Sequence, residues 1–320
     1  MRKRFSKILV TGGAGFIGSH LVERLLAEDY QVIVLDNLSY GNLKNISNRS
    51  SENFSVITCD IRDAKKMRIA LKDVEAVFHE AALVSVKLSV QDPLLNNDVN
   101  VTGTLNLLKT CVDAGVKRLV FASSAAVYGT NPNPLKKEDM VTSPTNPYGI
   151  SKLAAENYVK SFNELYGLET ISLRYFNAYG PKQSFDLENA YGGVITLFME
   201  RLLRNRSPII YGDGEQTRDF VYVQDIVQAN MLALTSKNVN GDFFNIGSGE
   251  VININHVAKA LKKKLNKEHI DNVYKAAQPG DVKHGYADIT KARKTLNYSP
   301  KFSFDHGITD LVKWYAKNIV

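Results

Sequence analysis

A glycine-rich stretch near the start of the chain limits its fold more than any other feature. The segment TGGAGFIG places Gly12, Gly15 and Gly18 three residues apart, after the apolar run ILV and before a segment with helical periodicity. Glycines here allow a tight strand-to-helix turn, and they let backbone N–H groups and the positive end of the helix dipole approach a pyrophosphate. The pattern therefore predicts a phosphate-binding turn at the first strand–helix junction of a βαβ unit.

An acidic residue at the end of the next apolar segment strengthens this interpretation. Asp36 ends QVIVLD and follows Gly18 by 18 residues, close to the spacing of about 20 residues in dinucleotide-binding units. A carboxylate at this place can bond both ribose hydroxyls and repels a 2′-phosphate, which favours NAD over NADP. The alternative is a turn whose glycines serve helix packing, combined with a capping aspartate.

The rest of the chain alternates between strand-like and helix-like segments. Apolar strands are predicted in FSVITCDIRD, AVFHEAAL, RLVFASSAAV and LETISLRYFNAYG, with helical stretches such as VNVTGTLNLLKTCVDAG between them. This alternation predicts an α/β fold, a Rossmann-like doubly wound parallel sheet with a smaller mixed α/β substrate-binding lobe. In CDIRD, Asp60 and Ile61 could bracket an adenine, although aspartates commonly follow strands.

The rhythm of the chain changes after Pro181. We expect residues 1–176 to form an NAD-binding domain and residues 177–320 to form mainly a substrate-binding domain, with segments near 217–247 returning to the first. The segment IIYGDGEQTRDFVYVQDI predicts hairpin-like strands around Gly212 and Gly214.

Composition argues against several classes of protein. The chain has 320 residues and only two cysteines, Cys59 and Cys111, which predicts a cytoplasmic protein without a disulfide framework. We expect no metal site, because no zinc-binding spacing occurs, and no membrane segment, because no apolar stretch approaches about 18 residues. The net charge of +7 includes the cluster KALKKKLNK at 259–267. Such a cluster could bind nucleic acid, but a solvated helix face is the simpler interpretation, and no nucleic-acid partner is expected.

A tyrosine and a lysine are placed four residues apart in PYGISK. Tyr148 and Lys152 would share one face of a helix that begins at Pro147. A phenol has a pKa of about 10, so it serves as a base near neutral pH only if nearby positive charges favour the phenolate. A neighbouring ammonium and a nicotinamide cation would do so, and we expect them to lower the pKa of Tyr148. The alternative is an incidental surface pair.

The chain as a whole resembles the extended short-chain dehydrogenase/reductase family. The motifs that carry the resemblance are TGGAGFIG, DN, CDIRD, HEAAL, SSAAVYG, YGISK, RYFNAYGP, GDGEQTRDFVYV and PGD. Within the family the chain is similar to nucleotide-sugar 4-epimerases of the UDP-galactose and UDP-N-acetylglucosamine type. The resemblance implies that Tyr148 is the base, that Lys152 holds the nicotinamide ribose, and that Ser124 bonds the reacting sugar hydroxyl.

The same resemblance implies two sets of binding residues. Those for NAD are Gly12, Gly15, Phe16, Ile17, Gly18, Asp36, Asn37, Ser39, Gly41, Asp60, Ile61, Ala81, Ala82, Asn100, Ser123, Tyr148, Lys152, Tyr175 and Phe176. Those for the UDP-sugar are Val84, Ser124, Tyr148, Asn177, Gly193, Val194, Tyr211, Arg218, Gln278, Asp281 and Gly285.

Two alanines separate the possible activities. Ala125 and Ala126 stand where the sister dehydratases carry an Asp–Glu pair and the decarboxylases a glutamate. Eliminating water needs an acid and a base beyond the tyrosine. We therefore expect an epimerase that inverts C4 of a UDP-hexose through a transient 4-keto intermediate and keeps its NAD bound. The alternatives are an NAD-dependent oxidoreductase such as a 4-keto-sugar reductase, and a non-enzymatic NAD sensor.

Substrate choice depends on Gly285 in this interpretation. The position matches one where relatives restricted to plain hexoses carry a tyrosine, so glycine predicts room for an acetamido group beside Gly193. We expect UDP-GlcNAc and UDP-GalNAc to be interconverted and UDP-Glc and UDP-Gal to be accepted; the alternative is a simple turn glycine.

The chain departs from the family pattern at two positions. Gln278 replaces an arginine that contacts the phosphates in many relatives, which predicts weaker nucleotide binding or a substitute cation. Glu80, in HEAAL, replaces an apolar residue, and the sequence offers no physical reason for this change.

A homodimer is the expected assembly. The segments DPLLNNDVNVTGTLNLLKTCV and PYGISKLAAENYVKSFNELYG carry apolar residues beyond one core stripe, including Leu153, Tyr158 and Phe162. A second apolar face favours a partner helix, and family members pair two such helices in this way. The alternative is contact with the sheet of the same chain.

Overall fold

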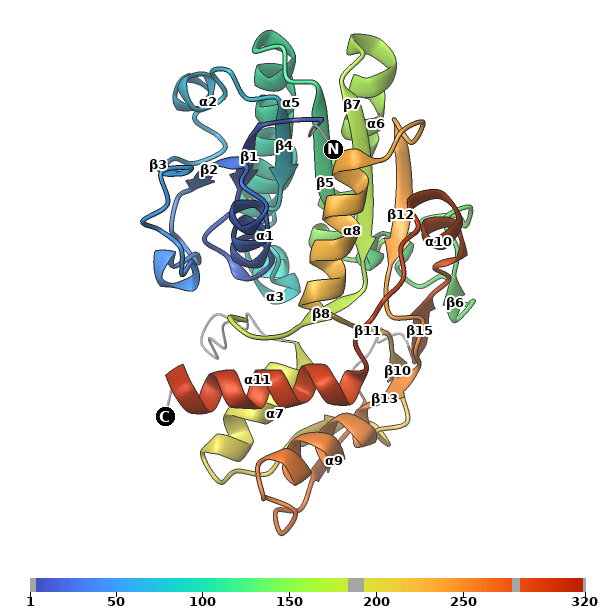
Figure 1. Ribbon diagram of the computed structural model, residues 1–320. Coiled ribbons are helices and arrows are strands. Elements are labelled where there is room, and N and C mark those ends of the chain that lie inside the picture. Colours follow the sequence, from blue (N-terminus) through green and yellow to red (C-terminus); the bar gives the residue numbers. More distant parts are fainter. Residues whose placement is uncertain (1–3, 184–192, 278–282, 319–320) are drawn as a thin grey trace.

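A seven-stranded sheet forms the larger of two lobes (Figure 1). The computed structural model describes residues 4–183, 193–277 and 283–318. All seven strands run parallel, as the alternation of strands and helices predicts. In spatial order they are β12 (Asp242–Ile246), β7 (Glu169–Tyr175), β5 (Arg118–Ser124), β4 (Ala76–His79), β1 (Lys7–Thr11), β2 (Gln31–Asp36) and β3 (Phe54–Thr58).

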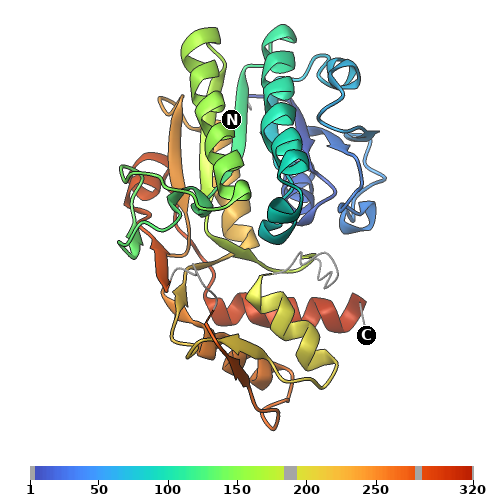
Figure 2. The same ribbon diagram turned by 180° about the vertical axis from the view of Figure 1, so that it is seen from behind.

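Helices cover both faces of this sheet. Strands β1, β2 and β4 are apolar along almost their whole length because both of their faces are covered. One face carries α1 (Phe16–Ala27) and α8 (Val223–Thr235). The other carries α2 (Ala64–Ala70), α5 (Gly103–Asp113) and α6 (Pro147–Tyr166), of which the last two lie side by side in Figure 2. This layered arrangement confirms the doubly wound fold.

The chain returns to the larger lobe after it has built part of the smaller one. Helix α8 packs against α1, and β12 completes the sheet by pairing with β7, so that Asp242 stands opposite Ile171. Helix α10 (Thr290–Leu296) then packs beside β12 and buries Ala292 and Leu296 in the same core.

The smaller lobe has a separate apolar core. Three helices, α7 (Val194–Leu203), α9 (Ile254–Lys264) and α11 (Phe304–Asn318), pack around it. A small sheet joins β13 (Ile252–Asn253), β10 (Thr217–Arg218), β15 (His284–Ala287) and β6 (Leu135–Lys136), and two further pairs join β11 (Phe220–Tyr222) with β8 (Asn177–Tyr179) and β14 (Val273–Lys275) with β9 (Ile209–Tyr211).

The predicted hairpin around Gly212 and Gly214 is wrong. Both glycines have left-handed φ values, 79° and 77°, but the strands on either side do not pair with each other. Strand β9 pairs with β14, and β10 pairs with β13 and β15. Partners distant in the sequence therefore determine this region.

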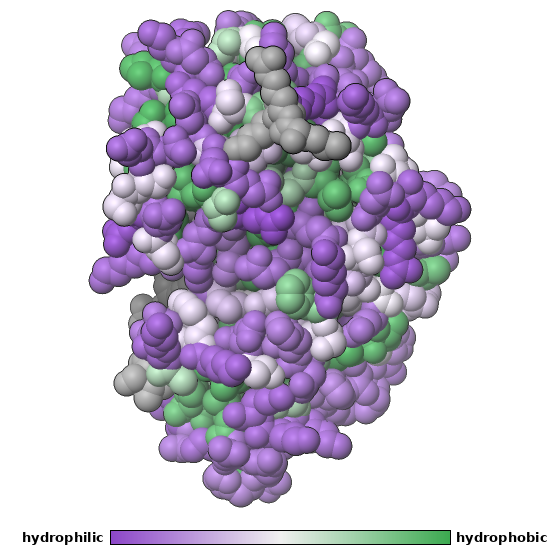
Figure 3. Space-filling model, in the orientation of Figure 1, coloured by the Kyte–Doolittle hydropathy of each residue, from purple (hydrophilic) through white to green (hydrophobic). Residues whose placement is uncertain are grey.

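Shorter elements link the main ones. They are α3 (Val86–Gln91), α4 (Pro93–Asn97), a π-helical turn (Asp98–Thr102) and two 3-10 turns (Leu43–Asn45 and Ala125–Tyr128). Figure 3 shows a mainly hydrophilic face with small scattered apolar groups. Among the helices described, none combines the length and apolar character needed to cross a bilayer.

The apolar residues predicted to form a second face on α6 differ in exposure. Phe162 belongs to the core beneath α5 and α6, contrary to the expectation, because its ring is only 7% exposed. Leu153 is partly buried against the sheet, whereas Tyr158 is 41% exposed. Of the three residues, only Tyr158 is open to a partner.

Candidate active site

A cleft of about 1020 Å³ crosses the carboxyl ends of the parallel strands. It contains residues that end or directly follow β1, β2, β3, β4, β5 and β7. Open α/β sheets bind ligands at this edge. Of the residues predicted to bind NAD, all except Asn100 line the cleft, and so do Val84 and Ser124 from the predicted sugar-binding set.

The glycine turn leaves no room for side chains. A Cβ on Gly12, whose φ is +65°, would lie 2.7 Å from the backbone nitrogen of Ala81. A Cβ on Gly18 would lie 2.2 Å from the carbonyl oxygen of Gly12. No side chain caps the N-terminus of α1. This close backbone packing fits a diphosphate that approaches the turn and the helix N-terminus.

Two carboxylates lie in fixed positions at the β2–β3 end of the cleft. Asp36 accepts hydrogen bonds from the backbone nitrogens of Ala14 at 3.0 Å and Leu38 at 2.8 Å, and burial raises its pKa. Asp60 is held by Arg62 at 2.9 Å, and hydrogen bonds from that arginine lower the pKa of Asp60 to about 2. The pair fits a ribose with free hydroxyls and opposes a phosphate on that ribose.

Helix α6 brings Tyr148 and Lys152 to the opposite end of the cleft. Asn146 caps the helix by accepting a hydrogen bond from the Gly149 nitrogen at 2.9 Å. Lys152 is 3% exposed, and its ammonium donates to the Ala122 carbonyl at 2.9 Å. Burial lowers the pKa of Lys152 to about 8, and the nearby carboxylate of Glu80 opposes this shift.

The protein alone does not lower the pKa of Tyr148, and the predicted lowering also requires the nicotinamide cation. Burial raises this pKa, and a hydrogen bond with Ser124 opposes the rise. The ammonium of Lys152 is directed to the Ala122 carbonyl, so burial prevails in the protein by itself.

The end of β5 supplies two serines with different partners. Ser123 donates to Glu156 at 2.6 Å, and Glu156 is paired with Arg174 in the interior. The Ser124 hydroxyl accepts from the Ala126 nitrogen at 3.1 Å and starts the 3-10 turn. Both serines line the cleft, but neither alanine that follows them does.

Sequence reasoning missed the place of Glu80. Its carboxylate accepts a hydrogen bond from the Tyr175 hydroxyl at 3.0 Å, and both residues line the cleft near Lys152. Burial raises the pKa of Glu80 to about 7, although the Tyr175 hydrogen bond and Lys152 oppose the rise. The departure in HEAAL was the only signal, and its partner lies 95 residues further along the chain.

Asn100 does not line the cleft, contrary to the expectation. It is 2% exposed and bonds both the nitrogen and the oxygen of Leu83, at 2.8 and 3.0 Å. Its amide also donates to Ser151 on α6 at 3.1 Å. The residue therefore ties the segment after Ala82 to α6 from behind the cleft.

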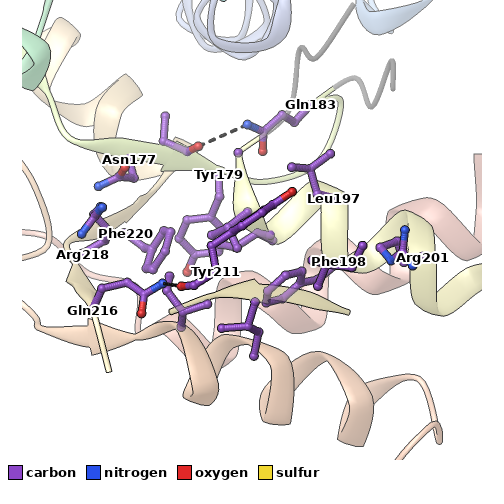
Figure 4. A pocket seen from close by; sticks show the side chains of 17 residues that line it. Asn177, Tyr179, Gln183, Leu197, Phe198, Arg201, Tyr211, Gln216, Arg218 and Phe220 are labelled. Carbon is purple, nitrogen blue, oxygen red and sulfur yellow. Dashed lines mark hydrogen bonds between the residues drawn. The ribbon is translucent and has the colours of Figure 1, made fainter. Parts of the chain in front are cut away.

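A second cavity of about 490 Å³ lies in the smaller lobe (Figure 4). It shares Ala178 and Gln183 with the cleft, so the two spaces adjoin. Five residues of the predicted sugar-binding set line it: Asn177, Gly193, Val194, Tyr211 and Arg218. Sequence reasoning missed Gln216, which donates to the Tyr211 carbonyl at 2.6 Å, and Arg201, which lies on the opposite side of the cavity from Arg218.

The remaining predicted sugar-binding residues do not line this cavity. Gly285 stands beside Arg218 in the small sheet, and no atom of the described residues lies within 4 Å of the place where its Cβ would be. It lines neither cavity among the residues described. Gln278 and Asp281 lie outside the described residues.

Comparisons with known proteins agree with this arrangement. The family model described as GDP-mannose 4,6 dehydratase matches residues 9–311. A protein of Methanocaldococcus jannaschii named putative UDP-glucose 4-epimerase is 42% identical over 97% of this chain and 99% of its own length. A UDP-N-acetyl-alpha-D-glucosaminuronate decarboxylase of Bacillus cytotoxicus is 32% identical over 99% of each chain.

Solved structures show the same fold. A UDP-N-acetylglucosamine 4-epimerase from Methanobrevibacter ruminantium, in complex with UDP-N-acetylmuramic acid, is 40% identical with a TM-score of 0.93 and covers 99% of this chain and 100% of its own. The UDP-glucose 4-epimerase of Thermus thermophilus, in complex with NAD, is 36% identical with a TM-score of 0.87 over 98% and 100%. The chain belongs to the family of enzymes described by the GDP-mannose 4,6 dehydratase model, which is part of the extended short-chain dehydrogenases/reductases.

Proposed function

We propose that this protein is an NAD-dependent UDP-sugar 4-epimerase. One observation carries the proposal: the cleft that holds the glycine turn and Asp36 at one end and Tyr148 and Lys152 at the other adjoins a cavity lined by Arg218. This arrangement supports a dinucleotide in the cleft and a UDP-sugar reaching it from the smaller lobe. The names of the epimerases that the chain resembles support the same activity.

The residues at the Tyr148 end can move the required proton. The Tyr148 phenolate accepts the proton of the C4 hydroxyl, and Ser124 bonds the same oxygen. Lys152 holds the cofactor ribose and adds positive charge beside the phenolate. Bound NAD supplies the acceptor, and then the donor, of a hydride. Tyr148 returns its proton after the flat 4-keto sugar has turned its other face.

The carboxylate pattern supports epimerisation rather than elimination. Ala125 and Ala126 provide no acid, and both lie outside the cleft wall. Asp36 and Asp60 lie at the other end of the cleft, where the adenosine ribose fits, and Glu80, the carboxylate at the Tyr148 end, accepts a hydrogen bond from Tyr175. Asp36 also favours NAD over NADP, since its charge repels a 2′-phosphate.

We assign two pairs of substrates to the enzyme. UDP-GlcNAc and UDP-GalNAc form the first, because no described residue has an atom within 4 Å of where a Cβ on Gly193 or Gly285 would stand. UDP-Glc and UDP-Gal form the second. In this assignment residues 1–176, joined by the segments near 217–247, form the NAD-binding domain, and residues 177–320 form mainly the UDP-sugar-binding domain.

The test is direct incubation with each of the four UDP-sugars, followed by separation of the products. We expect each sugar to be converted into its C4 epimer without added cofactor, and NAD to remain with the protein through gel filtration. Consumption of a reduced cofactor, or a product that has lost water or carbon dioxide, would show a different activity. Homodimer formation and a cytoplasmic location stay predictions.

A further inference from the structure

Glu80 is the one acidic side chain at the Tyr148 end of the cleft, among the residues described as lining it. It directly follows β4, while Tyr175 ends β7, and β5 lies between these two strands. The 3.0 Å hydrogen bond between the two side chains therefore spans the end of β5. Because β5 ends in Ser123 and Ser124, the carboxylate stands beside the reaction end of the cleft.

The surrounding hydrogen bonds fix Glu80 as an acceptor. The amide nitrogen of Asn230 donates to the Ile226 carbonyl at 3.0 Å and to the Tyr175 hydroxyl at 2.7 Å. The Ile226 carbonyl can only accept a hydrogen bond, so the nitrogen and not the oxygen of the fully buried Asn230 amide must face it. The Tyr175 oxygen thus accepts from Asn230, and its own proton points to Glu80. The chain of donors favours the ionised carboxylate.

Few other charges share this end of the cleft. Lys152, from α6, attracts the carboxylate, and burial opposes ionisation. Tyr148 and Tyr175 are the other titratable groups facing it, and burial keeps both protonated in the protein alone. His79 is neutral between Thr11 and Thr104, since burial lowers its pKa to about 3.

We propose that the Glu80 carboxylate, held by Tyr175, stabilises the oxidised cofactor over the reduced one and so sets the redox balance of the holoenzyme. The inference rests on the proposed function. When a hydride leaves C4, the C4–H bond breaks, the hydroxyl proton passes to Tyr148 and C4 becomes a carbonyl. The two electrons reach the nicotinamide ring, which loses its positive charge. A nearby negative charge favours the charged ring, and it therefore favours return of the hydride to the sugar.

The reduction potential of the bound cofactor tests this proposal. In Glu80→Gln the amide oxygen can still accept from Tyr175, but the negative charge is gone. A reductive titration of the holoenzyme can be monitored by the absorbance of the reduced cofactor. The midpoint potential of the variant should be at least about 30 mV less negative than that of the wild type. For a two-electron couple, this shift is a tenfold change in the equilibrium constant between the oxidised and the reduced form.

A matched control removes a carboxylate from the other end of the same cleft. Asp60→Asn should weaken the binding of NAD and NADH alike and leave the midpoint potential unchanged.

An unchanged potential in Glu80→Gln would overturn the proposal. A loss of turnover without a change in potential would also overturn it, because Glu80 would then act in proton transfer. If Glu80→Gln folds poorly, Tyr175→Phe, which removes the hydroxyl that holds the carboxylate, replaces it, and a ratio of NAD to NADH affinities equal to that of wild type overturns the proposal. A protein that binds no NAD would instead contradict the proposed function.

Discussion

Tyr148 lies where burial resists its ionisation, so its basicity depends on positive charge placed beside it. Tyr148→Phe removes only the hydroxyl and should leave the fold and the bound NAD intact. Turnover should fall by about 10²- to 10⁴-fold, the usual contribution of a general base. Product formation and the NAD content of the purified variant are the measurements. Turnover near the wild-type rate would exclude Tyr148 as the base.

Gly285 permits a test of substrate size because, among the residues that the structure describes, none has an atom within 4 Å of the place of its missing Cβ. Gly285→Tyr should fold normally, abolish conversion of UDP-GlcNAc and UDP-GalNAc, and spare UDP-Glc and UDP-Gal. Gly285→Ala is the control and should convert all four sugars. Equal loss for all four in Gly285→Tyr would show that the residue does not discriminate by size.

Single residues differ in how far the sequence reveals them. Spacing pointed to Gly12, Gly18 and the Tyr148–Lys152 pair, because each of these sets lies within one turn or one helix. It could not reveal that Asn100 bonds Leu83 instead of lining the cleft, or that Glu80 meets Tyr175, since those contacts join segments distant in the sequence.

At the scale of one element, the N-terminus of α6 links stability to activity. The side chain of Asn146 caps the helix two residues before Tyr148. Asn146→Ala should lower the free energy of unfolding by about 1 kcal/mol and lower turnover, because the first helical turn carries Tyr148. Urea unfolding and product formation measure the two effects.

A second cap provides the control for this change. Asn253 accepts from the His256 nitrogen at 2.7 Å at the start of α9, and it lines neither cavity. Asn253→Ala should lower the free energy of unfolding by a similar amount and leave turnover unchanged. If both variants keep full turnover, the cap of α6 does not position Tyr148.

Strand β4 and helix α1 each carry a histidine that makes stability depend on pH. Burial lowers the pKa of His79 to about 3 and that of His20 to about 4. An unfolded histidine titrates near 6.5, so the unfolded chain binds more protons and the folded state loses stability as pH falls from about 6.5 to 4. Thermal unfolding across this range measures the effect.

His20→Gln separates one contribution. The His20 ring bonds the Pro181 carbonyl at 2.9 Å and Gln224 at 3.2 Å, and glutamine offers both a donor and an acceptor. As the pH is lowered, the stability of the variant should fall less steeply than that of the wild type. A slope equal to that of wild type would mean that His20 titrates normally in the folded protein.

Elements were predictable where local pattern governs them. The alternation of apolar strands with helices indicated the parallel sheet, because βαβ units leave a regular period in the sequence. The hairpin at Gly212 and Gly214 was wrong because β14 and β15, more than 60 residues further on, supply the partners.

For the molecule as a whole, exposed apolar side chains on adjacent helices support the predicted homodimer. Ile150, Tyr158 and Leu165 of α6 are 54, 41 and 73% exposed, and Leu94 of the neighbouring α4 is 82% exposed. Light scattering at micromolar concentration should give the mass of a dimer. Tyr158→Glu should weaken it, whereas Ile69→Glu, at an apolar residue of α2 that is 74% exposed, should not. A monomeric wild type would contradict the prediction.

The pairing of β12 with β7 also affects how the chain assembles as the ribosome makes it. When residue 176 has been made, β7 still has an open edge, and the face that α8 will cover is bare. Open edges readily pair with other chains. The strands β8 to β11, which belong to the smaller lobe, must be made before β12 closes that edge. We therefore expect the nascent larger lobe to need protection until about residue 246, and its first 176 residues alone to form an aggregation-prone fragment rather than a free-standing domain.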